Sequence, residues 1–83
     1  MTEEKRENLK KQLYNLSKEE AKNFIEGKEE EIEENKKLQN LIMQALKEDD
    51  PVRYERERIE EITFLFYVQV MCENRSLYES RFI

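Results

Sequence analysis

The stretch from residue 59 to residue 72 constrains the fold most, because it is the most apolar part of a highly charged chain. Its sequence is IEEITFLFYVQVMC, and from Ile62 onward only Thr63 and Gln69 are polar. Charged residues make up 42% of the whole chain. This apolar run therefore has to be covered, either by the rest of the chain or by a second molecule.

Its composition leaves helix and strand open. Phenylalanine, tyrosine, valine and threonine favour strands, but the chain holds no second run of this kind to pair with it. One glycine and one proline are too few for the turns that hairpins use. We therefore predict a helix. Its apolar side chains occupy two opposite faces: Ile59, Ile62, Leu65 and Phe66 on one, and Phe64, Tyr67, Val68 and Met71 on the other.

The first part of the chain is predicted to form a short helix at about residues 3–15. Thr2 is a suitable N-cap for it. Its apolar side chains recur at the spacing of a single helical face, at Leu9, Leu13 and Leu16. Ser17 and Glu20 then match the capping-box pattern, which predicts the start of a second helix at about residue 18.

The second helix is predicted to run from about residue 18 to residue 47. Gly27 lies inside it and costs about 1 kcal/mol relative to alanine in a helix interior. This glycine either sits within one long helix or divides the segment into two. We favour one helix because the apolar spacing continues across the glycine, from Ile25 to Ile32.

Asp50 and Pro51 predict the start of a third helix, since aspartate is a good N-cap and proline suits the first helical position. We expect this helix at about residues 51–73, with a possible continuation into 76–82. A short connection makes the second and third helices antiparallel neighbours. The predicted fold is a single all-α domain over 1–83: a long antiparallel helical hairpin plus a short N-terminal helix, arranged like a three-helix bundle.

The arginines at the start of the third helix are interleaved with glutamates. Arg53 and Glu57 are four residues apart, as are Arg56 and Glu60. Opposite charges at this spacing pair along a helix. We therefore interpret the cluster as pairing within the third helix rather than as a basic binding patch.

The predicted hairpin leaves part of the apolar run uncovered. Residues 26–37 of the second helix face its most apolar half and offer only Ile32 as an apolar partner. Exposed patches of this kind mark interfaces, so we predict a homodimer or a higher oligomer. The predicted interface residues are Phe64, Tyr67, Val68 and Met71. The alternative is a monomer in which the first helix and the C-terminal residues complete the core.

The negative charge of the chain is local. Six glutamates and one lysine lie between Glu26 and Glu34, and this window accounts for the whole net charge of −5. At a rise of about 1.5 Å per residue, the charge density along the axis is comparable to that of double-stranded DNA. The candidate contact residues are Glu26, Glu29, Glu30, Glu33 and Glu34. The alternative is a solvated face that keeps the protein soluble.

These features predict a non-catalytic protein that binds other proteins. The first hypothesis is a small acidic regulator or inhibitor whose DNA-mimic-like glutamates dock on a basic, nucleic-acid-binding surface of a host or cognate protein. Its size and charge are typical of phage or plasmid inhibitors and antitoxins, an analogy of composition alone. The alternative is a structural oligomerisation or adaptor module that works through the apolar third helix. Direct binding to nucleic acid is disfavoured by the negative charge.

Residue types used in common catalytic and metal sites are missing. The chain has no histidine and a single cysteine, Cys72, so the usual near-neutral acid–base group is absent and no metal-ligand motif appears. We expect no enzymatic activity, no cofactor and no metal, and we expect Cys72 to be buried among apolar neighbours. The apolar run is shorter than the roughly 20 residues of a transmembrane helix. We therefore expect a cytoplasmic protein without a membrane contact.

Overall fold

The computed structural model describes residues 1–75. Their four helices are α1 (Glu3–Glu26), α2 (Glu29–Asp49), α3 (Pro51–Arg56) and α4 (Ile59–Glu73). No strand occurs among these residues, which confirms the predicted all-α class. The suggested continuation of the last helix into 76–82 lies outside the described residues.

The first helix is longer than predicted and ends at Gly27. Thr2 caps it as predicted, because its hydroxyl oxygen accepts a hydrogen bond from the Lys5 backbone N–H at 3.2 Å. Gly27 has a φ of 76°, a left-handed conformation that glycine adopts without the steric penalty of a Cβ atom. The predicted boundary between a helix at 3–15 and a helix at 18–47 is therefore wrong, as is the continuous helix across Gly27.

Ser17 does not begin a helix, although it fits the capping-box pattern. This residue is 2% exposed within α1, and its hydroxyl donates a hydrogen bond to the Thr63 carbonyl oxygen of α4. The Thr63 hydroxyl donates in turn to the Ile59 carbonyl oxygen at 2.6 Å. Buried polar groups need such partners, so the contact between α1 and α4 overrides the local capping pattern.

α3 begins where predicted, with Pro51 as its first residue. The Asp50 carboxylate accepts a hydrogen bond from the Arg53 backbone N–H at 3.1 Å. Arg53 Nε also donates to Glu57 Oε1 at 2.8 Å, which confirms this predicted pair. Glu60 lies on the following helix, where it accepts a hydrogen bond from the Tyr54 hydroxyl at 3.0 Å. The predicted ion pair between Arg56 and Glu60 is therefore wrong.

The predicted third helix over 51–73 is in fact two helices that meet at Glu57 and Arg58. Arg58 has a φ of 52°, a left-handed conformation that costs a non-glycine residue of order 1–3 kcal/mol. The turn lets Tyr54 of α3 and Ile59 of α4 both enter the core, where they are 4% and 0% exposed. We attribute the break to this gain in burial, which a straight helix would not provide for both side chains.

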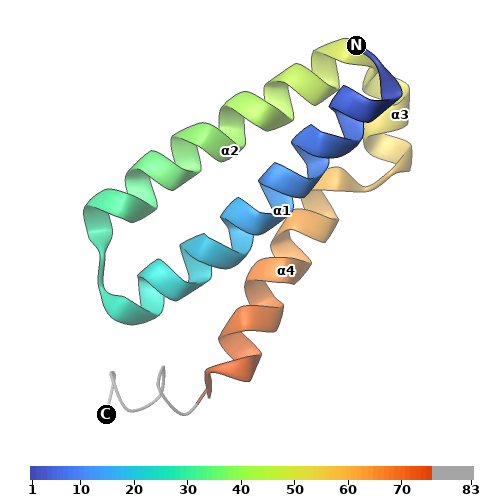
Figure 1. Ribbon diagram of the computed structural model, residues 1–83. Coiled ribbons are helices and arrows are strands. Elements are labelled where there is room, and N and C mark those ends of the chain that lie inside the picture. The colour runs from blue at the N-terminus through green and yellow to red at the C-terminus, as the bar shows by residue number, and fades with distance from the viewer. Residues whose placement is uncertain (76–83) are drawn as a thin grey trace.

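α1 is the central helix (Figure 1). α2 returns antiparallel along one side of α1, and α4 packs against another side while running in the same direction as α1. α2 and α4 make no comparably extensive contact with each other. The predicted hairpin of the second and third helices is therefore wrong. The hairpin forms between α1 and α2 because the chain reverses at Gly27, in the middle of the predicted second helix.

The apolar core lies at the end of the molecule where the four helices meet. Its side chains come from all of them: Leu13, Leu46, Tyr54 and Ile59, with Leu9, Tyr14, Ile42 and Met43 packed against them. Farther along α1 several of the buried contacts are polar, beside the buried apolar side chains of Ala21 and Val70. The Asn35 amide, for example, donates to the Leu16 carbonyl oxygen at 2.9 Å. The apolar half of α4 thus extends beyond the core that its first turn helps to form.

Candidate protein-binding surfaces

α1 covers only one side of α4. The residues of α4 that are buried are Ile59, Thr63 and Val70. Next to them, the Phe66 ring lies 5.2 Å from the Tyr14 ring, centroid to centroid. The Lys18 ammonium group lies 4.7 Å from the centroid of the same Phe66 ring, close enough for a cation–π contact. Among residues 1–75, no other helix covers the remaining sides of α4 to a similar extent.

The side chains that α1 leaves uncovered form what we call the apolar face of α4: Phe64, Leu65, Tyr67, Val68 and Met71. Phe64 is 64% exposed and Leu65 is 54% exposed, whereas the other three are half-buried. All four residues of the predicted interface belong to this face, and none of them is enclosed. Their contact with a second molecule stays a prediction.

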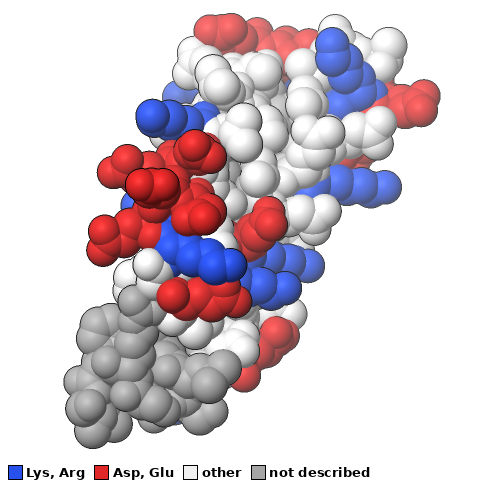
Figure 2. Space-filling view, turned by 60° about the vertical axis from the view of Figure 1, so that its left-hand side comes forward, with Lys and Arg blue, Asp and Glu red and all other residues white. Residues whose placement is uncertain are grey.

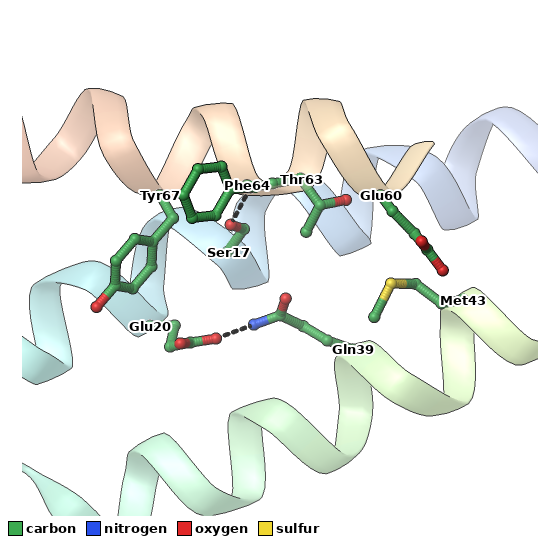
Figure 3. Close-up of a pocket in the computed structure, with 8 residues that line it drawn as sticks. All are labelled: Ser17, Glu20, Gln39, Met43, Glu60, Thr63, Phe64 and Tyr67. Carbon is green, nitrogen blue, oxygen red and sulfur yellow. Dashed lines mark hydrogen bonds between the residues drawn. The ribbon is translucent and has the colours of Figure 1, made fainter. Parts of the chain in front are cut away.

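A groove runs between α2 and α4, with α1 as its floor (Figure 3). Its volume is about 360 Å³, and eight residues from the three helices line it: Ser17, Glu20, Gln39, Met43, Glu60, Thr63, Phe64 and Tyr67. The rings of Phe64 and Tyr67 project from α4, and Met43 projects from α2. This groove could not be predicted from the sequence, because it depends on α1 lying between the two other helices.

The polar groups in this groove are already hydrogen-bonded. The Gln39 amide nitrogen donates to Glu20 Oε1 at 2.7 Å and to Asn35 Oδ1 at 2.6 Å. Burial raises the pKa of Tyr54, and the hydrogen bond from Tyr54 to Glu60 raises it further. Within residues 1–75, every buried polar side-chain atom has a hydrogen-bond partner. A binding partner would therefore interact mainly with the apolar walls.

A second groove lies between α1 and α2, and no α4 residue lines it. Its volume is also about 360 Å³, and its apolar lining comes from Leu16, Leu38 and Ile42. Leu38 is half exposed, and the neighbouring Leu41 is 67% exposed. Its polar lining residues are Gln12, Asn15 and Glu19. This second groove lacks the aromatic wall of the first.

The predicted acidic residues gather where α1 turns into α2. Glu26 is the last residue of α1, and the other four, Glu29, Glu30, Glu33 and Glu34, lie in the first turns of α2. All five are exposed, and Figure 2 shows acidic side chains crowded on one side of the molecule, beside several cations. Glu26 pairs with Lys28 at 2.8 Å. Among residues 1–75, the other four form no ion pair.

The most enclosed ion cluster joins the start of α1 to α2 and α3. Arg6 is 1% exposed. Its Nη1 atom lies 3.1 Å from Asp49 Oδ2, and its Nη2 atom lies 3.1 Å from Glu57 Oε1. Lys10 and Arg53 also pair with Glu57. This cluster was not predicted from the sequence. The signal that could have indicated it is the position of Arg6 in the same helical phase as the leucine stripe, seven residues before Leu13.

The surrounding cations keep Glu57 ionised. Burial raises the pKa of the Glu57 carboxyl, but hydrogen bonds from Lys10 and Arg6 outweigh it, and the pKa falls to about 2. Burial lowers the pKa of the Lys10 ammonium, but its hydrogen bonds to Glu57 and Glu7 raise the pKa overall. A carboxylate held this far below neutral pH is poorly suited to accept protons in catalysis. We interpret the cluster as a structural tie between helices.

No family model matches the chain, and comparisons with curated proteins and with solved structures found no match. Within residues 1–75, no helix combines the length and the apolar character needed to cross a membrane. The same part of the chain contains no group of three or more His, Cys, Asp or Glu residues placed to hold a metal ion. Cys72, predicted to be buried, is exposed, because it lies half a helical turn from the side of α4 that packs on α1.

Proposed function

We propose that this protein is a non-catalytic oligomerisation or adaptor module that works through the apolar face of α4. The observation that supports it is the exposure of two large apolar side chains, Phe64 at 64% and Leu65 at 54%. Monomeric proteins rarely expose contiguous apolar patches larger than about a few hundred Å², and larger patches mark interaction sites. The adjoining groove has the form of sites that receive an amphipathic helix.

Phe64→Asp is expected to raise the dissociation constant for self-association at least tenfold, because burial of a large apolar side chain contributes about 1.5–3 kcal/mol. Tyr67→Asp should act in the same direction. Association of the unchanged protein should depend little on salt, since apolar contacts are not screened by ions. Sedimentation equilibrium at low and high salt measures all three quantities.

Leu41→Asp is the matched control, because Leu41 is 67% exposed on α2 and lies outside the apolar face of α4. Circular dichroism should show unchanged helix content for each variant. The proposal fails if the unchanged protein is a monomer at every concentration. It also fails if Leu41→Asp weakens self-association as much as Phe64→Asp does.

The exposed carboxylates at the start of α2 favour a second candidate function. Here the protein is an acidic regulator or inhibitor that binds a basic, nucleic-acid-binding surface of a host or cognate protein. The supporting observation is that Glu29, Glu30, Glu33 and Glu34 are exposed and form no ion pair among residues 1–75. Acidic side chains in the first turn also stabilise a helix through its dipole, so this placement has a structural explanation as well.

For this second function, reversing Glu29, Glu30 and Glu33 to lysine is expected to weaken partner binding about tenfold, because electrostatic complementarity drives such contacts. Binding should also fall steeply as salt is added. Capture from a host lysate at low and high salt, with mass identification of the bound protein, measures both effects. The matched control reverses Glu4, Glu19 and Glu55, which are exposed elsewhere. Binding that survives the first triple reversal unchanged excludes this function.

A further inference from the structure

We infer that the groove between α2 and α4 binds a helix of a partner protein that carries a cationic side chain on each side of an apolar one. The inference goes beyond the proposed function, because it concerns the groove rather than self-association of the chain. Two features carry it: the arrangement of the three long helices, which leaves room for a fourth, and the two carboxylates that line the groove without a cation.

The helices α1, α2 and α4 occupy three corners of a four-helix bundle. In such a bundle each helix packs against two neighbours. α1 packs against both α2 and α4, whereas α2 and α4 make no comparably extensive contact with each other. The groove lies between these two helices, with α1 as its floor (Figure 3). A helix placed there would give α2 and α4 their second neighbour, in the manner of amphipathic helices that bind in grooves.

The walls of the groove fit an apolar side chain. Phe64 of α4 and Met43 of α2 lie on opposite walls. Phe64 is 64% exposed and Met43 is half-buried, so a ligand side chain placed between them would remove apolar surface of both from water. This burial is the main driving force of protein association. The walls therefore provide affinity for an amphipathic helix, and the charges of the groove decide which helix is preferred.

Both charged residues that line the groove are acidic, Glu20 from α1 and Glu60 from α4. Each accepts a hydrogen bond from a neutral donor: Glu20 from the Gln39 amide at 2.7 Å, and Glu60 from the Tyr54 hydroxyl at 3.0 Å. Neither forms an ion pair with any of residues 1–75. These hydrogen bonds use one oxygen of each carboxylate, so the second oxygen can accept from a cation of the ligand.

The two carboxylates are spaced for one face of a helix. α1 and α4 run in the same direction, and the hydrogen bond from Ser17 to the Thr63 carbonyl oxygen sets their register. Glu20 comes three residues after Ser17, and Glu60 comes three residues before Thr63. Their offset along the axes is therefore about 9 Å. Side chains seven residues apart on one helical face are about 10.5 Å apart, so two cations at this spacing would meet both carboxylates.

The same charges disfavour α4 of a second copy as the occupant of the groove. Residues 59–73 contain three glutamates and no lysine or arginine. A second α4 would bring these glutamates toward Glu20 and Glu60, and like charges disfavour an interface. A basic amphipathic helix of another protein complements both the apolar walls and the carboxylates.

The probe is a synthetic peptide with two arginines seven residues apart and a leucine midway between them. A lactam bridge on its opposite face holds it helical, because short isolated helices are marginal in water. The matched peptide has glutamine in place of both arginines. Fluorescence anisotropy is expected to show that the protein binds the arginine peptide about fivefold more tightly. This difference should shrink at high salt, since ions screen exposed charges.

Glu20→Gln with Glu60→Gln tests whether these carboxylates make the contact. Glutamine keeps an acceptor oxygen for each existing hydrogen bond but has no charge, so circular dichroism should show an unchanged fold. The double variant is expected to bind the arginine peptide about fivefold more weakly and the glutamine peptide as before, which is the result of direct coupling. Glu19→Gln with Glu55→Gln is the matched control, because both carboxylates are exposed and lie outside this groove.

Three results would overturn the inference. Binding of neither peptide would show that the groove does not receive such a helix, and equal binding of both would show that the cations play no part. A control pair that weakens binding as much as the groove pair would mean that only the overall charge of the protein matters. Self-association that strengthens in Glu20→Gln with Glu60→Gln would also contradict the inference, because it would show that a second copy fills the groove.

Sedimentation of the protein without peptide tests the proposed function separately. A monomeric protein that prefers the arginine peptide, and loses this preference in Glu20→Gln with Glu60→Gln, supports the inference and excludes self-association. A protein that self-associates but does not distinguish the two peptides keeps the proposed function and loses the inference.

Discussion

Replacing Arg6 by alanine is expected to lower the free energy of unfolding by about 3 kcal/mol, since it removes a buried side chain that pairs with two carboxylates at once, and loss of one partner of a buried ion pair is strongly destabilising. The Arg6 guanidinium bridges Asp49 of α2 and Glu57, and it also donates to the Leu46 carbonyl oxygen at 3.4 Å. Its loss removes the tie between three segments at once. For a domain whose whole stability is about 5–15 kcal/mol, this is a large fraction.

Urea unfolding followed by circular dichroism measures the effect. Lys11→Ala is the matched control, because Lys11 lies on the same helix and is exposed, so it should cost little. Arg6→Lys keeps the charge but offers a compact ammonium in place of a planar fork, so an intermediate loss is expected. An Arg6→Ala variant as stable as Lys11→Ala would show that the cluster contributes nothing beyond burial of the side chain.

The parts of the fold that local chemistry controls were predictable from the sequence. Thr2 and Asp50 act as N-caps because a short polar side chain satisfies free backbone N–H groups at any helix start. The helical state of the apolar run followed from the lack of turn residues and of a partner strand. None of these inferences required knowledge of which helices are neighbours.

The helix boundaries that depend on tertiary contacts were not predictable in this way. A glycine inside a helix costs only about 1 kcal/mol, so the sequence around Gly27 allowed both a continuous helix and a turn. The structure takes the turn, and α1 then lies between α2 and α4. Ser17 and Arg58 show the same effect. Ser17 bonds to a distant carbonyl, and Arg58 adopts a left-handed conformation where two side chains enter the core.

The candidate surface was predictable only in part. A helix that is apolar on all sides needs more covering than one neighbour supplies, and this argument located Phe64, Tyr67, Val68 and Met71 without coordinates. The groove beside them was not predictable, since it requires Met43 of α2 to stand across α1 from Phe64. Cys72 was predicted to be buried because its neighbours in the sequence are apolar. It is exposed because α1 packs against the opposite side of α4.

The ion cluster around Glu57 also makes stability depend on pH. The pKa of the Glu57 carboxyl falls from an ordinary value of 4.5 to about 2 in the folded protein. A carboxyl with a lowered folded-state pKa contributes stability that is present above its unfolded pKa and lost as the pH falls through its folded pKa. The contribution of Glu57 is therefore complete above pH 4.5 and disappears as the pH falls toward 2.

Glu57→Gln is accordingly expected to lower the free energy of unfolding by about 2 kcal/mol at neutral pH. This is less than the full pKa shift of Glu57 implies, because solvent screens a partly exposed ion pair. The Glu57 side chain is 21% exposed. Below pH 4.5 the difference from the unchanged protein should shrink progressively, because a protonated glutamate and a glutamine are both neutral and neither offsets Arg6, Lys10 and Arg53. Denaturant unfolding from pH 7 to pH 2.5, with Glu55→Gln as the control for loss of an exposed charge, measures this convergence. If the loss of unfolding free energy in Glu57→Gln stays constant across this pH range, packing rather than charge holds Glu57 in place.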